Sequence, residues 1–227
     1  MSILSLLFPE KCIFCGRLIQ MKEYEERGCC KACANEQFVR RYQDVTQLEI
    51  LPQIHALYCP LVYTDKAKNT LIRYKFQGEN WMAHPLASLL HRYITIQGGY
   101  TSCNYITAVP ISSKRFKERG YNQAELIAQQ LSKYTGIPYV QFLRRVEDTS
   151  AAQTGKMNRL ERLESKRFEP LDNVTIRPDS GVLLIDDILT TGSTLNECAD
   201  ILLNMGAGFI KAAVLASGRK DIGGLSA

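Results

Sequence analysis

The sequence predicts an α/β protein with a mostly parallel sheet, on two observations. From residue 57 onward, short apolar runs alternate with amphipathic stretches, which is the order of β-α-β units around a parallel sheet. The composition, 45% hydrophobic and 22% charged among 227 residues, is that of a folded globular protein. A chain of this length holds one core and a small appendage. We therefore expect an N-terminal segment, 1–55, and an α/β domain, 56–227.

Four strands are expected where apolar and β-branched residues could lie in a sheet covered on both faces. They are Tyr105–Val109, Tyr139–Leu143, Val182–Ile185 and Ile210–Leu215. The polar and basic stretch of about 144–180 is interpreted as a hood loop that covers a site.

Two helices follow from apolar residues at helical spacing. The first runs from about 124 to 135, where Gly136 and Pro138 end it. The second buries a stripe between Leu195 and Met205. A capping-box pattern of Thr194 with Glu197 predicts that this second helix begins at Thr194.

The net charge of +5 is too mild to prove nucleic-acid binding, but its distribution is uneven. Three blocks, 64–75, 111–121 and 144–167, each carry a net +3. They indicate either solvated loops or contacts with a polyanion such as a phosphate or a nucleic-acid strand. No apolar run approaches the ~20 residues of a membrane span, and the first residues lack the layout of a secretory signal, so a cytoplasmic protein is expected.

The most informative stretch is 182–194, which reads VLLIDDILTTGST. Asp186 and Asp187 come where the apolar strand would emerge, and ligands of open α/β sheets bind at that end, so both acids are expected to face a site. The following turn offers hydroxyls, backbone N–H groups and a helix N-terminus. It therefore predicts a phosphate cradle made of Thr190, Thr191, Gly192, Ser193 and Thr194. Two acids beside a phosphate suit a ribose diol or a hydrated Mg²⁺; the alternative is a helix cap with two exposed acids.

This stretch resembles the phosphoribosyl pyrophosphate (PRPP) motif of type I phosphoribosyltransferases. The resemblance implies a type I phosphoribosyltransferase-like core, with Asp186 and Asp187 at the ribose and its Mg²⁺ and with the turn of 190–194 at the 5′-phosphate. It also implies that the strand-end loop of Pro110, Ile111 and Ser112 approaches the pyrophosphate, which Arg115 and Arg119 could neutralise. The alternative for these two arginines is a solvated helix approach.

Five of the eight cysteines lie between Cys12 and Cys33. Two CxxC pairs with metal-ligand spacing predict a closed, structural Zn²⁺ site formed by Cys12, Cys15, Cys30 and Cys33. Cys29 is an adjacent alternative to Cys30, although the CxxC spacing favours Cys30. The three scattered cysteines are interpreted as buried apolar residues: Cys59, Cys103 and Cys198.

Four motifs follow one another in the order found in the ComF family of competence proteins: the two CxxC knuckles, Tyr74–Gly78, Arg119–Gln123 and the PRPP motif. The chain resembles the ComFC-like branch of this family over nearly its whole length. The resemblance implies a role in natural transformation, with a ComFA-type DNA helicase as partner and single-stranded DNA as a further candidate. One departure lies at 162–168, which reads RLESKRF where an Arg-x-x-Asn arrangement is expected.

Three functions stay open at this point. The first is a PRPP-binding competence protein that supports DNA handling. The second is an active phosphoribosyltransferase of nucleotide salvage, for which the residues identify neither a general base nor an acceptor base. The third is a nucleic-acid or helicase adaptor whose PRPP site is vestigial.

Overall fold

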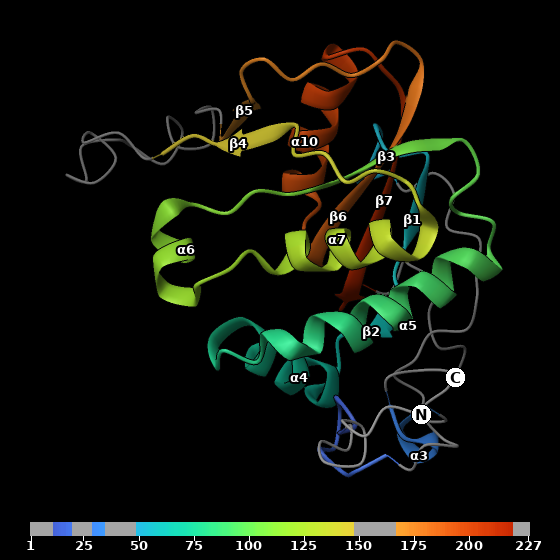
Figure 1. The fold of residues 1–227 in the computed structure, drawn as a ribbon, viewed down its shortest axis with the longest axis vertical. Coiled ribbons are helices and arrows are strands. Elements are labelled where there is room, and N and C mark those ends of the chain that lie inside the picture. The colour runs from blue at the N-terminus through green and yellow to red at the C-terminus, as the bar shows by residue number, and fades with distance from the viewer. Residues whose placement is uncertain (1–10, 20–28, 35–48, 148–166, 220–227) are drawn as a thin grey trace.

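The computed structural model describes residues 11–19, 29–34, 49–147 and 167–219, and a parallel sheet lies at their centre (Figure 1). The strand order is β1-β7-β6-β3, with β2 also paired to β7. Every strand pair of this sheet within the described ranges is parallel, which confirms the predicted α/β class. Its strands are β1 (Ala56–Tyr58), β2 (Leu61–Val62), β3 (Cys103–Ala108), β6 (Ser180–Leu189) and β7 (Ala207–Ser217).

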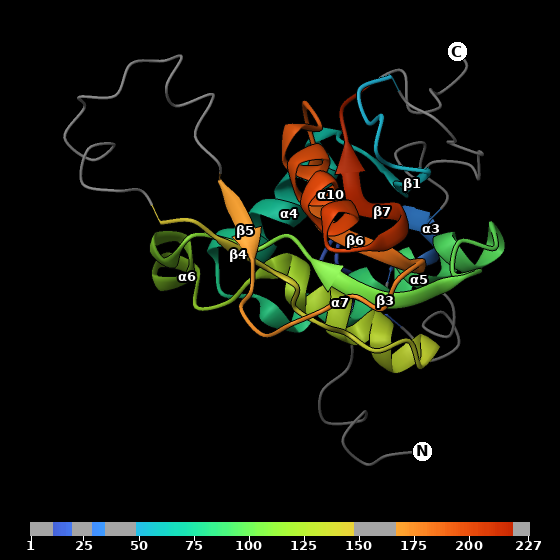
Figure 2. The ribbon, with the colours of Figure 1, turned by 90° about the horizontal axis from the view of Figure 1, so that it is seen from above.

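Helices cover both faces of this sheet, as Figure 2 shows from above. On one face lie α4 (Asp65–Phe76), α5 (Ala83–Ile96) and α7 (Gln123–Thr135), and on the other lies α10 (Ser193–Asn204). The remaining helical segments are short: α3 (Lys31–Ala34), η1 (Asn80–Met82) and α6 (Ser113–Arg119). No helix among the described ranges is long and apolar enough to cross a bilayer.

The middle of β6 explains why the sheet is buried on both sides. Successive side chains of a strand point to opposite faces. Leu183 and Ile185 accordingly join the core cluster of α5 and α7, whereas Val182 and Leu184 join that of α10. All four are completely buried, so a run without polar alternation is what this position requires.

The prediction of one strand at Tyr139–Leu143 is wrong, because this stretch does not form a continuous strand. Tyr139 makes one isolated bridge to Ile106, and the chain then turns into β4 (Leu143–Arg145), which pairs antiparallel with β5 (Phe168–Pro170). Phe142 is buried in the cluster around α10 and its ring lies 5.3 Å from that of Tyr105 of β3, so it packs against the sheet without being a strand residue of it.

The predicted start of α10 at Thr194 is also wrong, by one residue. The helix begins at Ser193, and Gly192 precedes it in the left-handed conformation without a side-chain cap. Glu197 does not complete a capping box, because its carboxylate accepts hydrogen bonds from the backbone N–H of Arg167 and Phe168 and from Arg167 Nε.

The hood predicted at 144–180 is described at its two ends, where β4 and β5 form a small two-stranded sheet; residues 148–166 lie outside the described ranges. The basic block at 64–75 is a helix, α4, and most of the block at 111–121 belongs to α6. The three scattered cysteines are buried, as expected: Cys59, Cys103 and Cys198.

Candidate functional site

A pocket of about 590 Å³ opens at the carboxyl ends of β3 and β6. Its wall contains most of the residues that the sequence assigned to a sugar phosphate: Pro110, Ile111, Arg115, Arg119, Asp186, Asp187, Thr190 and Thr194. Four predicted residues are not on the wall, although they neighbour it in the chain: Ser112, Thr191, Gly192 and Ser193.

The two acids of β6 reach the pocket from opposite faces of one strand. Asp187 follows Leu183 and Ile185 in the alternation and points toward α4, where Lys75 Nζ lies 2.8 Å from its Oδ2 atom. Asp186 belongs to the face of α10, and its Oδ1 atom accepts a hydrogen bond of 2.8 Å from the backbone N–H of Asp187. The acids are therefore adjacent in sequence but differ in their surroundings.

The electrostatics of the acid pair follow from those surroundings. Burial, and then the negative charge of Asp187, raise the pKa of Asp186 to about 7, although Lys75 and Arg115 act in the opposite sense. Asp187 has a cation in contact. A divalent cation or a hydroxyl donor placed between the acids would satisfy both carboxylates.

The hydroxyl-rich turn after β6 packs against Ile50 and Leu51. Gly192 has a φ of +84°, and a Cβ atom there would lie 2.8 Å from Leu51 Cδ2, so glycine is required on both counts. Asn196 Nδ2 donates to the carbonyl of Ile50, which anchors the first turn of α10. Thr190 and Thr191 remain exposed and can meet a ligand.

The loop after β3 ends in Ser112, whose side chain caps the N-terminus of α6. Ser112 Oγ accepts a hydrogen bond of 3.3 Å from Arg115 N, which starts α6. Glu147, at the edge of the described residues, accepts a hydrogen bond of 2.9 Å from Ser113 N. The side chain of Arg115 is exposed and lines the pocket, so a ligand can reach it.

Arg119 is fixed more tightly than a surface cation would be. Its guanidinium lies 4.7 Å from the ring centre of Phe76, and NH1 donates to Gln123 Oε1 at 3.0 Å. Burial and the nearby Arg115 lower the pKa of Arg119, although arginine stays protonated at neutral pH.

The segments Tyr74–Gly78 and Arg119–Gln123 are in direct contact. The Tyr74 hydroxyl donates to the carbonyl of Gln123 at 2.9 Å, and the Tyr121 hydroxyl donates in return to the carbonyl of Tyr74. Gln123 Nε2 donates to the carbonyl of Lys75 at 3.5 Å. Together these bonds fix the end of α4 and the position of Lys75.

Lys75 is the site residue that sequence reasoning missed. It lay within the noted segment Tyr74–Gly78, but nothing in the spacing indicated a charge pair with an acid more than a hundred positions later. Arg145 and Arg219 also line the pocket, so five basic side chains of the described ranges face two acids. The pocket therefore favours a ligand with several negative charges.

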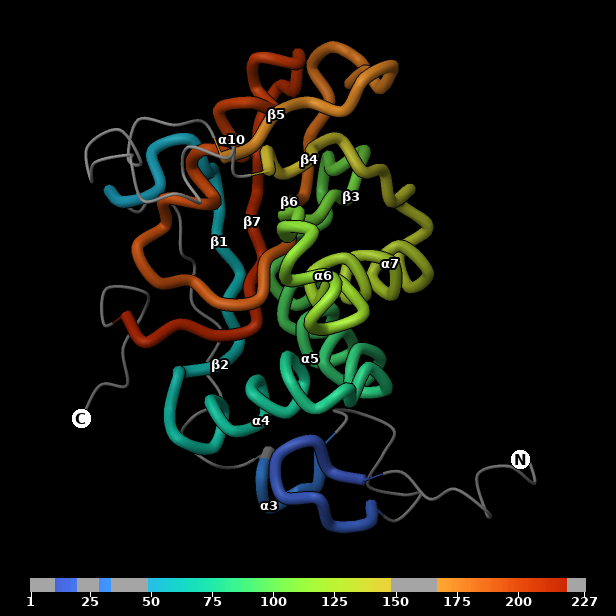
Figure 3. The backbone as a smooth tube through the Cα atoms, turned by 90° about the vertical axis from the view of Figure 1, so that its left-hand side faces the viewer, coloured from blue at the N-terminus to red at the C-terminus, as the bar shows by residue number. Residues whose placement is uncertain are grey.

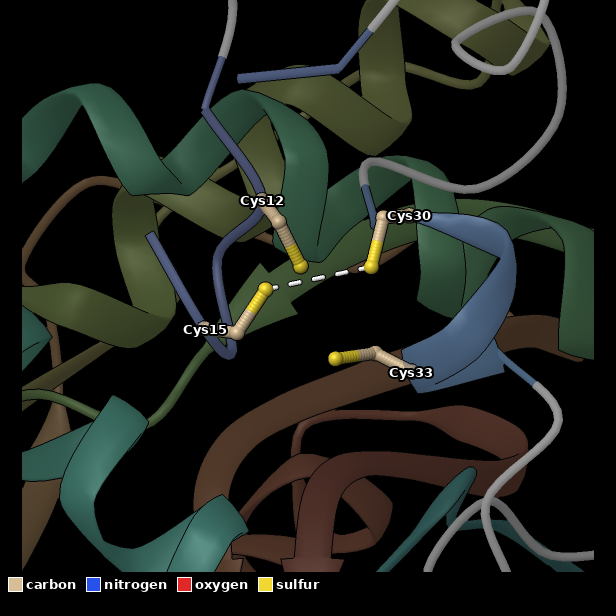
Figure 4. Close-up of side chains that lie close together, drawn as sticks. All are labelled: Cys12, Cys15, Cys30 and Cys33. Atoms are coloured by element: carbon tan, nitrogen blue, oxygen red, sulfur yellow. Dashed lines mark hydrogen bonds between the residues drawn. The ribbon is translucent and has the colours of Figure 1, made fainter. Parts of the chain in front are cut away.

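The four predicted cysteines form a second centre, at the far side of α4 (Figure 3). Their sulfur atoms lie within 4.8 Å of one another and point toward a common centre from two segments (Figure 4). The Sγ atoms of Cys15 and Cys30 are 3.8 Å apart, which is close to the about 3.8 Å expected between thiolates bound tetrahedrally to zinc at 2.3 Å. We call residues 11–19 and 29–34 the cysteine knuckle.

The chemistry of this set fits zinc. Cys30 and Cys33 of the second CxxC pair belong to the group of four, and the buried Cys29 does not. Burial opposes ionisation of Cys30, but hydrogen bonds from the backbone and thiol of Cys33 and from the other thiols outweigh it and lower its pKa to about 7. Burial raises the pKa of Cys12 and of Cys33. Four sulfurs leave no position for a substrate, so a bound zinc would be structural.

The sequence is similar to that of known proteins over most of its length. Residues 117–223 match the family described as phosphoribosyl transferase domain. Competence protein F of Haemophilus influenzae is 34% identical over 151 residues, which cover 63% of this chain and 65% of that protein. Competence protein ComFC of Bacillus subtilis is 29% identical over 196 residues, which cover 86% of this chain and 72% of that protein.

Two further comparisons add breadth. The DNA utilization protein YhgH of Salmonella typhi is 31% identical over 155 residues, 66% of each chain. The chain thus spans about two thirds of the length of the curated relatives that it matches. A purine phosphoribosyltransferase structure from Pyrococcus horikoshii superposes on 60% of this chain and 74% of its own, with 18% identity and a TM-score of 0.38, too low a likeness to bear on function.

Proposed function

Because the chain belongs to the ComF family of phosphoribosyltransferase-like proteins, we propose that it binds PRPP with Mg²⁺ and acts in DNA uptake during natural transformation. Relatives that carry the names competence protein F and ComFC support the second half of this proposal. A cytoplasmic location and a ComFA-type DNA helicase as partner belong to the same proposal.

One observation carries the PRPP half of the proposal. The acids of β6, the turn after them and the loop after β3 line a single pocket, although more than seventy residues separate the two segments. A sugar that bears phosphates at both ends needs an anion site for each phosphate, here the turn after β6 and the loop after β3. Between them it needs groups that accept hydrogen bonds from the sugar hydroxyls, here the two carboxylates. The excess of basic side chains around the pocket supports the same ligand.

Each part of the ligand has proposed contacts. Asp186 and Asp187 accept hydrogen bonds from the ribose hydroxyls and hold Mg²⁺. The 5′-phosphate lies in the turn of Thr190, Thr191, Gly192, Ser193 and Thr194, whereas Pro110, Ile111, Ser112, Arg115 and Arg119 surround the pyrophosphate. The side chain of Arg119 is held by Phe76 and Gln123, whereas that of Arg115 is exposed. We therefore expect Arg115 to be the arginine that moves to contact the pyrophosphate.

A transfer reaction, if the pocket performs one, would break the bond between the anomeric carbon and pyrophosphate and form a bond to a nitrogen nucleophile. Mg²⁺ would supply positive charge to the departing pyrophosphate. The chain's own contribution is electrostatic: Arg115 neutralises the leaving group, while the acids and the turn orient the sugar. Active phosphoribosyl transfer is therefore the second candidate for this pocket.

Calorimetric titration with PRPP and Mg²⁺ tests the binding site. We expect heat from the wild type and at least a tenfold weaker affinity for the double variant Asp186→Asn, Asp187→Asn, since bonds to charged groups contribute about 1.5–3 kcal/mol each. The variant Asp179→Asn, Asp200→Asn removes two exposed acids outside the pocket and serves as the charge-matched control. A wild type that gives no heat refutes PRPP binding.

A deletion strain tests the biological half. Loss of transformation without nucleotide auxotrophy supports the competence role, and auxotrophy alone would indicate salvage. Release of pyrophosphate that depends on one particular added base would identify an active transferase.

A single DNA strand as an additional partner is favoured by one surface. Helices α4 and α6 are in contact, and each exposes a phenylalanine, Phe76 and Phe116, beside the basic residues of 114–119. Aromatic rings next to cations suit stacked bases and phosphates. Replacing Phe116, which is not on the pocket wall, by alanine should weaken binding of an oligothymidine while PRPP affinity is retained. Oligothymidine binding that does not weaken as the salt concentration rises would refute this partner.

A further inference from the structure

Helix α4 carries two different sets of contacts on opposite faces. Successive residues of an α-helix are turned by about 100°. Thr70 and Arg73 therefore lie on one face, whereas Ile72, Lys75 and Phe76 lie on the other, where they line the pocket. The face of Thr70 and Arg73 is the one beside the cysteine knuckle, which lies next to α4 on the side away from the sheet (Figures 1 and 3).

Two hydrogen bonds join α4 to the knuckle at one carbonyl group, beside the apolar packing of Ile13, Ala67 and Leu71 in one core cluster. The carbonyl of Ile13 accepts hydrogen bonds from Arg73 NH1 at 3.2 Å and from Thr70 Oγ1 at 3.3 Å. Thr70 has a single hydroxyl proton and also lies 3.0 Å from the carbonyl of Lys66, so Arg73 makes the firmer link. The rest of the Arg73 guanidinium is held by Glu79, at 3.1 and 2.6 Å.

The position of the Ile13 carbonyl depends on the knuckle turn. Ile13 lies between the first two cysteines and is completely buried. The turn is closed by Cys12 N–H to the carbonyl of Arg17 at 2.7 Å and by Gly16 N–H to the carbonyl of Cys12 at 2.8 Å. A metal that joins Cys12 and Cys15 to the second cysteine pair would fix this turn against α4.

At the other face, the geometry of the pocket depends on where α4 lies. Lys75 comes two residues after Arg73 and meets Asp187 at 2.8 Å, with both side chains less than one fifth exposed. Displacements of about 1 Å in such a constellation can change function severalfold or more. A movement of α4 would therefore change the charge and orientation that Asp187 offers to a ligand.

We propose that Arg73 is a positioning residue through which the cysteine knuckle sets the Lys75–Asp187 pair, so that the state of the knuckle controls ligand affinity in a pocket to which it contributes no side chain. This proposal rests on the proposed PRPP site and adds a control to it. Coupling between two sites of a protein typically changes the affinity of one site for its ligand by about 5- to 150-fold.

The first test uses Arg73→Gln with the four cysteines intact. We expect the variant to retain bound zinc, measured with a chromophoric chelator, but to bind PRPP and Mg²⁺ at least fivefold more weakly at a temperature far below its unfolding midpoint. The matched control is Arg144→Gln, which also breaks an arginine–glutamate pair, with Glu169, but on β4 and off the pocket wall. Equal affinity of Arg73→Gln and wild type, with zinc bound, would overturn the proposal.

The second test does not require PRPP. Hydrogen exchange, measured before and after removal of zinc by a chelator, should lose protection in α4 and keep it in α10, which packs on the other face of the sheet. The single tryptophan, Trp81, follows Glu79 closely and is 44% exposed, so its emission should change at the same time. Unchanged exchange in α4, or equal loss in α4 and α10, contradicts the proposal.

The two tests separate this proposal from the function on which it rests. If the wild type gives no heat with PRPP, the proposed function fails, while the exchange experiment still decides whether the knuckle holds α4. If PRPP binds and Arg73→Gln binds equally well, the function stands and the positioning role of Arg73 fails.

Discussion

The cysteine knuckle and the pocket at the end of β6 are built in opposite ways. The knuckle takes its four sulfurs from two short segments, a turn and the start of α3, and their spacing is visible in the sequence. The pocket takes its wall from α4, from the loop after β3, from β5 and β6 and from the end of β7. The knuckle is therefore a local arrangement that a bound metal could hold, whereas the pocket depends on the complete fold.

The largest expected effect comes from removing a knuckle ligand. Cys33→Ser should lose zinc and lower the free energy of unfolding by on the order of 5 kcal/mol or more, because structural zinc contributes about 10–16 kcal/mol in isolated zinc fingers. Zinc content and urea unfolding measure this. Cys29→Ser, at a buried cysteine outside the group, should keep its zinc. If Cys33→Ser binds zinc as tightly as wild type, the four-sulfur assignment is wrong.

The charge pair of the pocket gives the next effect. Lys75→Met leaves Asp187 half-buried without its cation and should cost about 2 kcal/mol of stability. Adding Asp187→Asn should restore part of this loss, since the two residues act as one pair. Denaturant unfolding of the two single variants and the double variant measures the coupling. Lys133→Met, at an exposed lysine of α7, should change stability by less than about 0.5 kcal/mol.

The turn after β6 offers a comparison between two glycines of positive φ. Gly192→Ala should cost about 2 kcal/mol, because strain at a φ of +84° is added to a clash with Leu51, which is buried and has little room to move. Gly136→Ala, at +73° with open space around it, should cost about 1 kcal/mol. Thermal unfolding compares them, and equal costs would show that the Leu51 contact is unimportant.

The smallest effect concerns the contact between the two motif segments. Tyr74→Phe removes the hydroxyl that donates to the carbonyl of Gln123 and should cost about 1 kcal/mol, since that hydrogen bond is buried. Tyr134→Phe removes a longer and exposed hydrogen bond, 3.4 Å to the carbonyl of His84, and should cost close to nothing. Urea midpoints of the two variants measure the difference, which would vanish if the contact of Tyr74 carried no stability.

The parts of the fold that the sequence predicts are those whose signals are local. The strand through Val182–Ile185, the glycine turn and the helix after it follow from neighbouring residues, and so do the two CxxC pairs. Even there, the first residue of α10 was missed. Glu197 meets Arg167, a residue from a distant part of the chain, and no local rule reports such a competitor.

The parts that could not be predicted depend on contacts between distant segments. Helix α5 has no side-chain cap and follows η1 directly, so it lacks a local start signal, although its less buried residues recur at helical spacing on one face: His84, Ser88, His91, Arg92 and Thr95. Helix α4 is rich in charges and was interpreted as part of a basic block. Its lysine becomes a site residue because the fold brings it to Asp187.

The position of β7 has a consequence for how the protein is made. β1 and β2 lie early in the chain, but their hydrogen-bond partner is β7, with Ala56 opposite Lys211 and Leu61 opposite Ala216. During translation these early strands must wait unpaired until almost all of the sheet has left the ribosome. Closure of the sheet should therefore be late and slow, and nascent chains stalled before β7 should be clients of chaperones.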